Sequence, residues 1–235
     1  MANLLRKSSA EFLGTATLVA TVIGSGIMGT LLTTNLALVL LINALATVAV
    51  LGVLIWIFGP ISGAHFNPVV TGVALFRKEM RFPEGTTYMV AQIAGACTGA
   101  IVANIMFDVP AISLSTRERI DTDLLLGELV ATAGLLLVIG ALTRTGRGHL
   151  GPILVPAWIG AAYFFTSSTS FANPAVTIGR SLSDTFAGIS MNSVPNFIVF
   201  QILGASIGAA LTAYFYPRSH PEPLDLPDPV HQPGR

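Results

Sequence analysis

Six long apolar runs are the feature that most constrains how this chain can fold. They cover residues 12–34, 36–59, 88–107, 124–142, 150–167 and 196–216. Each is close to the roughly 20 residues that an α-helix needs to cross about 30 Å of hydrocarbon. Only 10% of the 235 residues are charged, against about 25% in a soluble domain, so the chain cannot cover itself with a solvated surface. The sequence therefore predicts an all-α membrane protein with six transmembrane helices.

Positive charge is unevenly distributed among the connections between these runs. The connections on one side of the predicted bundle carry Arg6, Lys7, Arg77, Lys78, Arg81, Arg144, Arg147 and Arg218. On the other side, the 108–123 connection carries two arginines that four acidic residues offset. Because cytoplasmic loops are enriched in Lys and Arg, we expect both termini to be cytoplasmic. The net charge of zero gives no electrostatic reason to expect a nucleic-acid partner.

The two halves of the sequence repeat the same landmarks in the same order. AEFLGTATLV at 10–19 corresponds to GELVATAGLL at 127–136, and AQIAGACTGA at 91–100 corresponds to FQILGASIGA at 200–209. One Asn-Pro pair lies between the landmarks of each half. Because each half holds three spans, the second half enters the membrane from the opposite side. We expect one domain over 1–216, with inverted halves of about 8–107 and 124–216, and a disordered, Pro-rich cytoplasmic tail over 217–235.

Each Asn-Pro pair opens a short apolar run, at Asn67 and at Asn173. Asn caps free N–H groups at a helix start, and Pro fits the first helical position. A helix of about ten residues from Asn67 to Phe76 reaches about 15 Å, half of the bilayer core. The run 173–182 is similar. An ordinary helix start in a loop is the alternative for one such motif, but two matched motifs favour half-helices whose ends meet at a water-filled path. The approaches 62–66 and 166–172 would show carbonyls to that path.

The chain resembles the aquaporin and glycerol facilitator family of major intrinsic proteins over nearly all of residues 8–216. The markers are the AEFxGT opening, SGxHFNPxV, the second motif NPA, and the matched Glu and Gln landmarks. The resemblance implies six tilted helices plus two re-entrant half-helices, usually in a homotetramer, in the bacterial inner (cell) membrane among lipid. It implies a passive channel for small neutral solutes rather than an enzyme, with no cofactor and no metal.

The resemblance also assigns pore roles to residues around both motifs. The side-chain amides of Asn67 and Asn173 would donate hydrogen bonds to a passing oxygen, while the positive ends of both half-helices oppose cations. The intramembrane carboxylates Glu11 and Glu128 would accept N–H bonds from the re-entrant loops; a proton relay is the alternative. The remaining motif and pore-lining residues implied are Pro68, Val69, Pro174, Ala175, Gly63, Ala64, His65, Phe66, Thr169, Phe171 and Ala172.

The expected selectivity filter departs from that of water-selective members of the family. Val176 stands three residues after the second Asn, where those members have Arg, and Thr47 stands where a bulky aromatic is common. We interpret the filter as wide and Arg-less. Arg180 is expected to be a helix-end cation that faces lipid headgroups or loop. The other expected filter residues are Ser170 and, as alternatives in the fifth span, Ala161 or Ser167.

The stretches FTSSTSFANPAV and SDTFAGI resemble a bacterial branch of the family that is linked to arsenic-resistance operons. This resemblance implies arsenous acid or methylated arsenite as solutes, beside water and glycerol-like polyols. A water-selective aquaporin is the alternative within the channel class. A coupled transporter would need charged or ion-coordinating groups at the midplane, where this chain offers two Asn amides and alkyl groups. A structural membrane protein is the remaining alternative, against which the intact Asn-Pro motifs argue.

Overall fold

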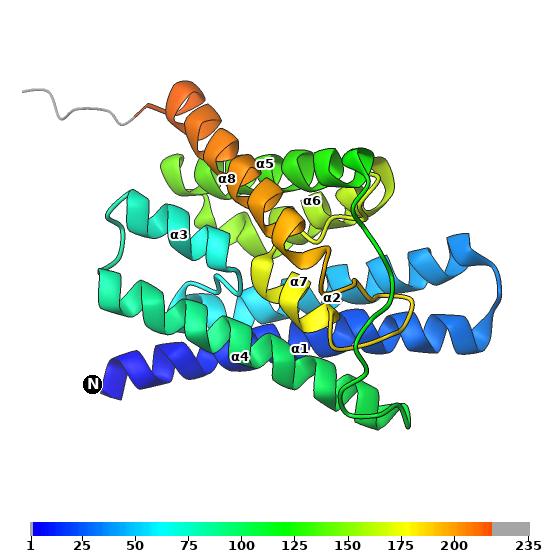
Figure 1. Cartoon of the computed structure of the whole chain (residues 1–235). Coiled ribbons are helices and arrows are strands. Elements are labelled where there is room, and N and C mark those ends of the chain that lie inside the picture. Colours follow the sequence, from blue (N-terminus) through cyan, green and yellow to red (C-terminus); the bar gives the residue numbers. More distant parts are fainter. Residues whose placement is uncertain (1, 218–235) are drawn as a thin grey trace, which may run out of the picture.

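The computed structural model describes residues 2–217, and every regular element within that range is helical. Six of its helical segments are long and apolar enough to cross a membrane, which confirms the six predicted spans (Figure 1). The expected tail lies, from residue 218 on, outside the described residues. The spanning helices are α1 (Ala2–Leu32), α2 (Leu36–Ser62), α4 (Phe82–Met106), α5 (Thr122–Arg144), α6 (Gly151–Phe165), which follows a 3₁₀ turn at Gly148–Leu150, and α8 (Val194–Phe215).

Some helices begin earlier than the apolar runs indicate. The helix α4 begins at Phe82, six residues before its apolar run, because Pro83 fits the first turn and Glu84 complements the positive end of the helix. The helix α1 begins near the start of the chain, and its Lys7 forms an ion pair of 2.7 Å with Glu84. This pair joins α1 to α4 beyond their apolar segments.

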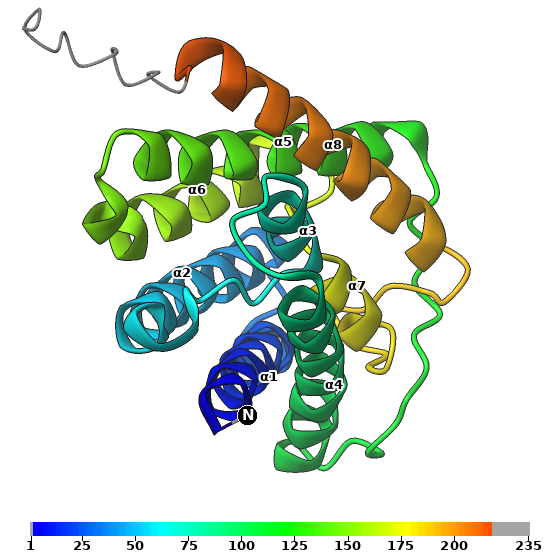
Figure 2. The same cartoon turned by 90° about the vertical axis from the view of Figure 1, so that its left-hand side faces the viewer.

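Two short helices, α3 (Pro68–Phe76) and α7 (Pro174–Arg180), lie among the long ones (Figure 2). Both begin at the Asn-Pro pairs, as the sequence predicts. The side chain of Asn67 accepts the backbone N–H of Val69, and that of Asn173 accepts the N–H groups of Ala175 and Val176. The helix α7 ends at Arg180, two residues before the predicted end of that run. Both helices are too short to cross a bilayer, and their capping residues Asn67 and Asn173 are buried, so these capped ends lie inside the bundle.

The inverted repeat appears in the packing of the long helices. The helix α1 packs against α4, and α5 packs in the same way against α8. The close crossings use equivalent glycines: a Cβ on Gly95 would collide with the carbonyl of Phe12, and one on Gly204 with that of Leu129. The backbones can therefore approach closely at corresponding places in each half.

Large apolar side chains cover the outside of the bundle. Trp56, Val90, Leu126 and Ile153 are all more than half exposed and come from four different helices. Such a surface is costly in water and suits hydrocarbon, so the protein crosses the membrane several times. The beginning of α1 and the end of α8 lie at the same end of the bundle, as an even number of spans requires (Figure 1).

Candidate functional site

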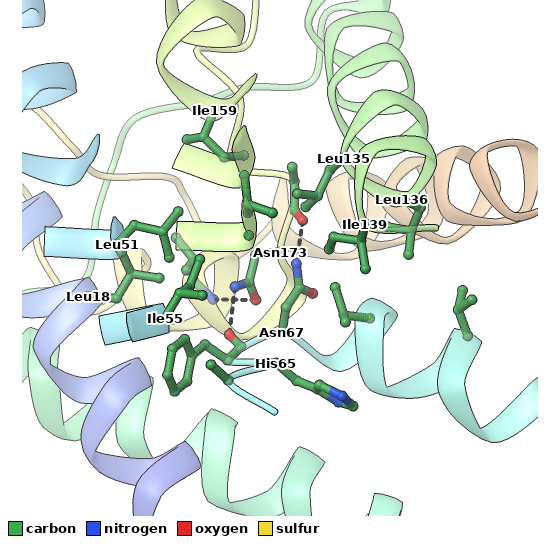
Figure 3. A pocket seen from close by; sticks show the side chains of 18 of the residues that line it. Leu18, Leu51, Ile55, His65, Asn67, Leu135, Leu136, Ile139, Ile159 and Asn173 are labelled. Atoms are coloured by element: carbon green, nitrogen blue, oxygen red, sulfur yellow. Dashed lines mark hydrogen bonds between the residues drawn. The ribbon is translucent and has the colours of Figure 1, made fainter. Parts of the chain in front are cut away.

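A cavity of about 300 Å³ runs through the bundle where the two short helices meet. Asn67 and Asn173 face its centre, and apolar side chains such as Leu51, Leu135 and Ile159 surround them (Figure 3). The polarity of the lining differs between the two sides of the cavity. Helices α1, α2, α5 and α6 supply mainly alkyl groups, while the loops before α3 and α7 supply polar groups. The cavity is therefore amphipathic in cross-section.

Each of the two asparagines ties its own helix start to the opposite loop. The Nδ2 of Asn67 donates to the carbonyl of Ala172 at 2.7 Å, and the Nδ2 of Asn173 donates to that of Phe66 at 2.8 Å. The Oδ1 atoms cap the short helices. A primary amide has two N–H donors, so each asparagine keeps one that these bonds do not use. The pair is held rigidly, with one donor on each side available to the cavity.

The loops that carry these carbonyls adopt the same unusual backbone in both halves. Ala64 and Phe66 have φ of 51° and 49°, and Ser170 and Ala172 have φ of 52° and 48°. Left-handed conformations cost residues with a side chain about 1–3 kcal/mol each. The carbonyls that the asparagines bind belong to Phe66 and Ala172, so the strained residues are the ones that join the two halves.

Two fully buried carboxylates hold the strained loops. Glu11 accepts the backbone N–H groups of His65 at 3.0 Å and Phe66 at 2.6 Å, and also the Gln92 amide at 2.8 Å. These bonds satisfy N–H groups that the non-helical loop leaves without backbone partners. The Ser62 hydroxyl donates to the same carboxylate at 2.6 Å.

Glu128 makes the equivalent contacts in the second half. It accepts the N–H groups of Phe171 and Ala172, both at 2.9 Å, and the amide of Gln201 at 2.6 Å. The Gln landmarks therefore position the carboxylates, and each Gln amide also reaches a threonine of its short helix. Both glutamates lie in the geometry that the resemblance implies for loop support.

The structure places most of the expected motif and pore residues along the cavity and the others outside its lining. Thr169 is not part of the lining, although it was expected there. Pro68, Val69, Pro174 and Ala175 also lie outside the lining, where they form the starts of the short helices. The expected residues that do line the cavity are Gly63, Ala64, His65, Phe66, Asn67, Phe171, Ala172, Asn173, Thr47, Ser170 and Val176.

Both alternatives for the fifth span are wrong. Ala161 is exposed on the outside of α6, and Ser167 lies beyond the end of that helix, where its hydroxyl donates to the carbonyl of Asp123. The residue of α6 that lines the cavity beside Thr47 is Tyr163, which is almost entirely buried, with 3.2 Å between the two hydroxyl oxygens. Two residues turn a helix by about 200°, so Ala161 and Tyr163 face opposite ways. The sequence signal for Tyr163 was that it is a single Tyr in an apolar helix. A buried Tyr hydroxyl needs a hydrogen-bond partner, which lipid does not supply.

The expected orientation of Arg180 is also wrong. Its side chain is 3% exposed and lines the cavity, with its guanidinium carbon 3.4 Å from the centre of the Phe171 ring. Arg180 follows Val176 by four residues and therefore lies on the same face of α7. Helical side chains also lean toward the helix N-terminus, which brings the guanidinium back over the preceding turn. The spacing of four residues between Val176 and Arg180 was the sequence signal for this orientation. The cavity lining therefore does contain an arginine at this end.

A second buried arginine, which the sequence did not single out, supports this region. Arg119, in the connection between α4 and α5, is 6% exposed and lies 5.0 Å from the Phe171 ring centre. Its Nε donates to the carbonyl of Gly188 at 3.0 Å. Burial, followed by the charge of Arg180, lowers its pKa to about 9. It therefore remains protonated at neutral pH.

Comparison with known proteins agrees with this architecture. The model of the family described as major intrinsic protein matches residues 1–170. Aquaglyceroporin AqpS of Rhizobium meliloti (strain 1021) is 44% identical over 219 residues, which cover 93% of this chain and 94% of that protein. Glycerol uptake facilitator protein-like 6 of Lactiplantibacillus plantarum is 30% identical over 226 residues, covering 89% and 96%. The X-ray structure of an aquaglyceroporin from Plasmodium falciparum shares the fold, with a TM-score of 0.65 at 22% identity, covering 91% and 95%.

Proposed function

Because the chain belongs to the major intrinsic protein family and is thus a passive channel rather than an enzyme, we propose that it conducts small neutral hydroxylated solutes. Water, glycerol-like polyols and arsenous acid or its methylated forms are the solutes that we assign to it. The pathway is the central cavity, and the end of that cavity at Tyr163 and Arg180 is the extracellular end. Both termini are cytoplasmic, and the functional unit is a homotetramer with one pore in each subunit.

The observation that carries this proposal is the asparagine pair at the centre of an amphipathic cavity. Asn67 and Asn173 each keep one N–H donor, and the positive ends of α3 and α7 meet beside them. A neutral solute exchanges its water for these donors and for loop carbonyls, while its carbon face lies against the alkyl wall. A cation meets positive potential there, and among the described residues the carboxylate of the cavity lining, Glu79, lies beyond the end of α3 rather than beside the asparagine pair.

Two small side chains near the extracellular end of the cavity favour solutes larger than water. Thr47 and Val176 are smaller than the aromatic ring and the Arg expected at the equivalent positions of water-selective members of the family, which leaves more room beside these two residues. Arsenous acid is a neutral trihydroxy solute of glycerol-like size, so the same donors would accommodate both. The similarity to an aquaglyceroporin and to a glycerol facilitator supports this solute class.

Stopped-flow light scattering on proteoliposomes tests the proposal directly. Vesicles that hold the protein are challenged with glycerol, and arsenite entry is measured in parallel against empty vesicles. We expect rapid re-swelling in glycerol and arsenite entry well above that background. Water flux without glycerol or arsenite flux would favour the water-selective alternative, and absence of all three would contradict a channel role.

A matched pair of variants shows whether flux passes the asparagine pair. Asn173→Asp keeps the oxygen that caps α7 but removes the donor to the Phe66 carbonyl and adds negative charge at the positive helix ends. We expect its glycerol flux to fall well below wild type. Asn192→Asp makes the same chemical change at an exposed position and should leave flux unchanged. Equal flux in both variants would argue against this pathway.

A further inference from the structure

Arg180 has the geometry of a residue that controls what enters the cavity. It is the last residue of α7, and its side chain is almost entirely buried although it carries a positive charge. Burying a charge is costly unless the charge is held by partners. The helix C-terminus and the Phe171 ring supply part of that stabilisation.

The guanidinium is held from one side only. Within the described part of the chain, the one hydrogen bond of the Arg180 side chain runs from Nε to the carbonyl of Ala187. The guanidinium carbon also lies over the Phe171 ring. Both terminal nitrogens therefore keep N–H donors that these contacts do not use, and the group lines the same cavity as Thr47 and Tyr163.

Arg180 and Arg119 are held by adjacent carbonyls of one loop and by the same aromatic ring. The next carbonyl, that of Gly188, binds Arg119, whose guanidinium lies 5.0 Å from the same Phe171 ring. Phe171 is in turn fixed by its N–H bond to Glu128 and by an edge contact with Phe197 at 5.1 Å. Consecutive carbonyls and one ring thus hold two guanidinium groups at the cavity end, which leaves Arg180 little freedom to swing away.

We propose that Arg180 is the specificity-determining cation at this end of the pathway, supplied one helical turn beyond the position where Val176 stands. Its charge repels cations before they reach the asparagine pair, and its free N–H groups donate hydrogen bonds to the oxygens of neutral solutes. Although Arg180 follows Val176 by one turn, its guanidinium leans back toward Phe171, so it lines the same part of the cavity as Val176. This inference rests on the proposed channel function and names the residue that sets its charge selectivity.

The test compares urea with guanidinium, which have the same planar shape and differ in charge. Entry of each is measured in proteoliposomes that contain the full chain. We expect the wild type to admit urea and exclude guanidinium. In Arg180→Gln, guanidinium entry should rise by about tenfold or more while urea entry changes little, because one fixed charge is removed from a narrow path. Arg180→Lys keeps the charge and should keep guanidinium out.

Arg117→Gln is the matched control. Arg117 is in the same connection as Arg119 and binds the carbonyl of Phe186, but it is exposed and lies outside the cavity lining. Its loss removes one positive charge from this end of the protein and leaves the Arg180 guanidinium in the cavity, so guanidinium should stay excluded. Equal exclusion in Arg180→Gln and wild type would overturn the inference. Free passage of guanidinium through the wild type would overturn it without any variant, which covers the case of a variant that does not fold. Absence of both water and urea flux in the wild type would instead overturn the proposed function and this inference with it.

Discussion

Replacing Glu128 with glutamine should disable the pore while leaving the long helices folded. The carboxylate accepts three hydrogen bonds, from the N–H groups of Phe171 and Ala172 at 2.9 Å and from Gln201 at 2.6 Å. Glutamine offers one oxygen in place of two, so at least one loop N–H would face another donor. The bonds that remain would change from charged to neutral.

The size of the effect follows from these contacts. Hydrogen bonds to a charged group contribute about 1.5–3 kcal/mol each and neutral ones about 0.5–1.5, so the second loop would exchange two charged bonds for one neutral bond and lose about 2.5–4.5 kcal/mol. That loss is larger than the typical cost of one left-handed residue in the loop, about 1–3 kcal/mol, so the loop should relax. The Ala172 carbonyl would then no longer be held for Asn67, although the packing of α5 against α8 would remain.

The assay combines glycerol flux in proteoliposomes with thermal unfolding and helical content in detergent. We expect Glu128→Gln to lose most of its flux and to unfold at a lower temperature, with near wild-type helical content. Glu84→Gln is the control, because that carboxylate is partly exposed and its ion pair with Lys7 is worth at most about 1 kcal/mol. Wild-type flux and unfolding temperature in Glu128→Gln would refute the reasoning.

Two further changes test the lining at the Arg180 end. Val176→Arg should narrow the cavity and place a second guanidinium one turn before Arg180, so glycerol and arsenite flux should fall more than water flux; unchanged solute flux would refute the place of Val176 in the filter. Tyr163→Ala removes the ring that meets Thr47 and should raise glycerol flux several-fold, whereas Ala161→Leu, on the outer face of α6, should leave it at the wild-type level. Equal effects of these last two would refute the assignment of Tyr163 to the cavity.

The sites that the sequence predicted well are those where local chemistry leaves few choices. Asn-Pro at 67 and 173 predicts a helix start, and both short helices begin there. The repeated Glu and Gln landmarks occupy equivalent places because the two halves must support two identical loops. The structure brings Glu11 and Glu128 to those loops with matching hydrogen bonds.

The predictions that failed concern which way a side chain points. Ala161 was placed by counting back from Asn173, and a register error of two residues turns a helical residue from the pore to the lipid. Ser167 and Thr169 were placed by the resemblance and lie beyond the end of α6, where the loop conformation decides which way they point. Arg180 was placed by its distance along α7, which overlooks that a long side chain leans back over the preceding turn. Arg119 carries no local signal, because its place depends on how the 107–121 connection packs against the connection between α7 and α8, where it binds Gly188 and Ser193.

Six apolar runs and two Asn-Pro motifs were enough to determine the spans and the half-helices, because the membrane demands about 20 apolar residues per crossing and tolerates free N–H groups only beside a water-filled path. Only the tertiary structure decided that the second half-helix ends in an arginine that faces the cavity. The reason is that its partners, the Phe171 ring and the Ala187 carbonyl, lie seven to nine residues away along the chain and approach it only through the folded loops.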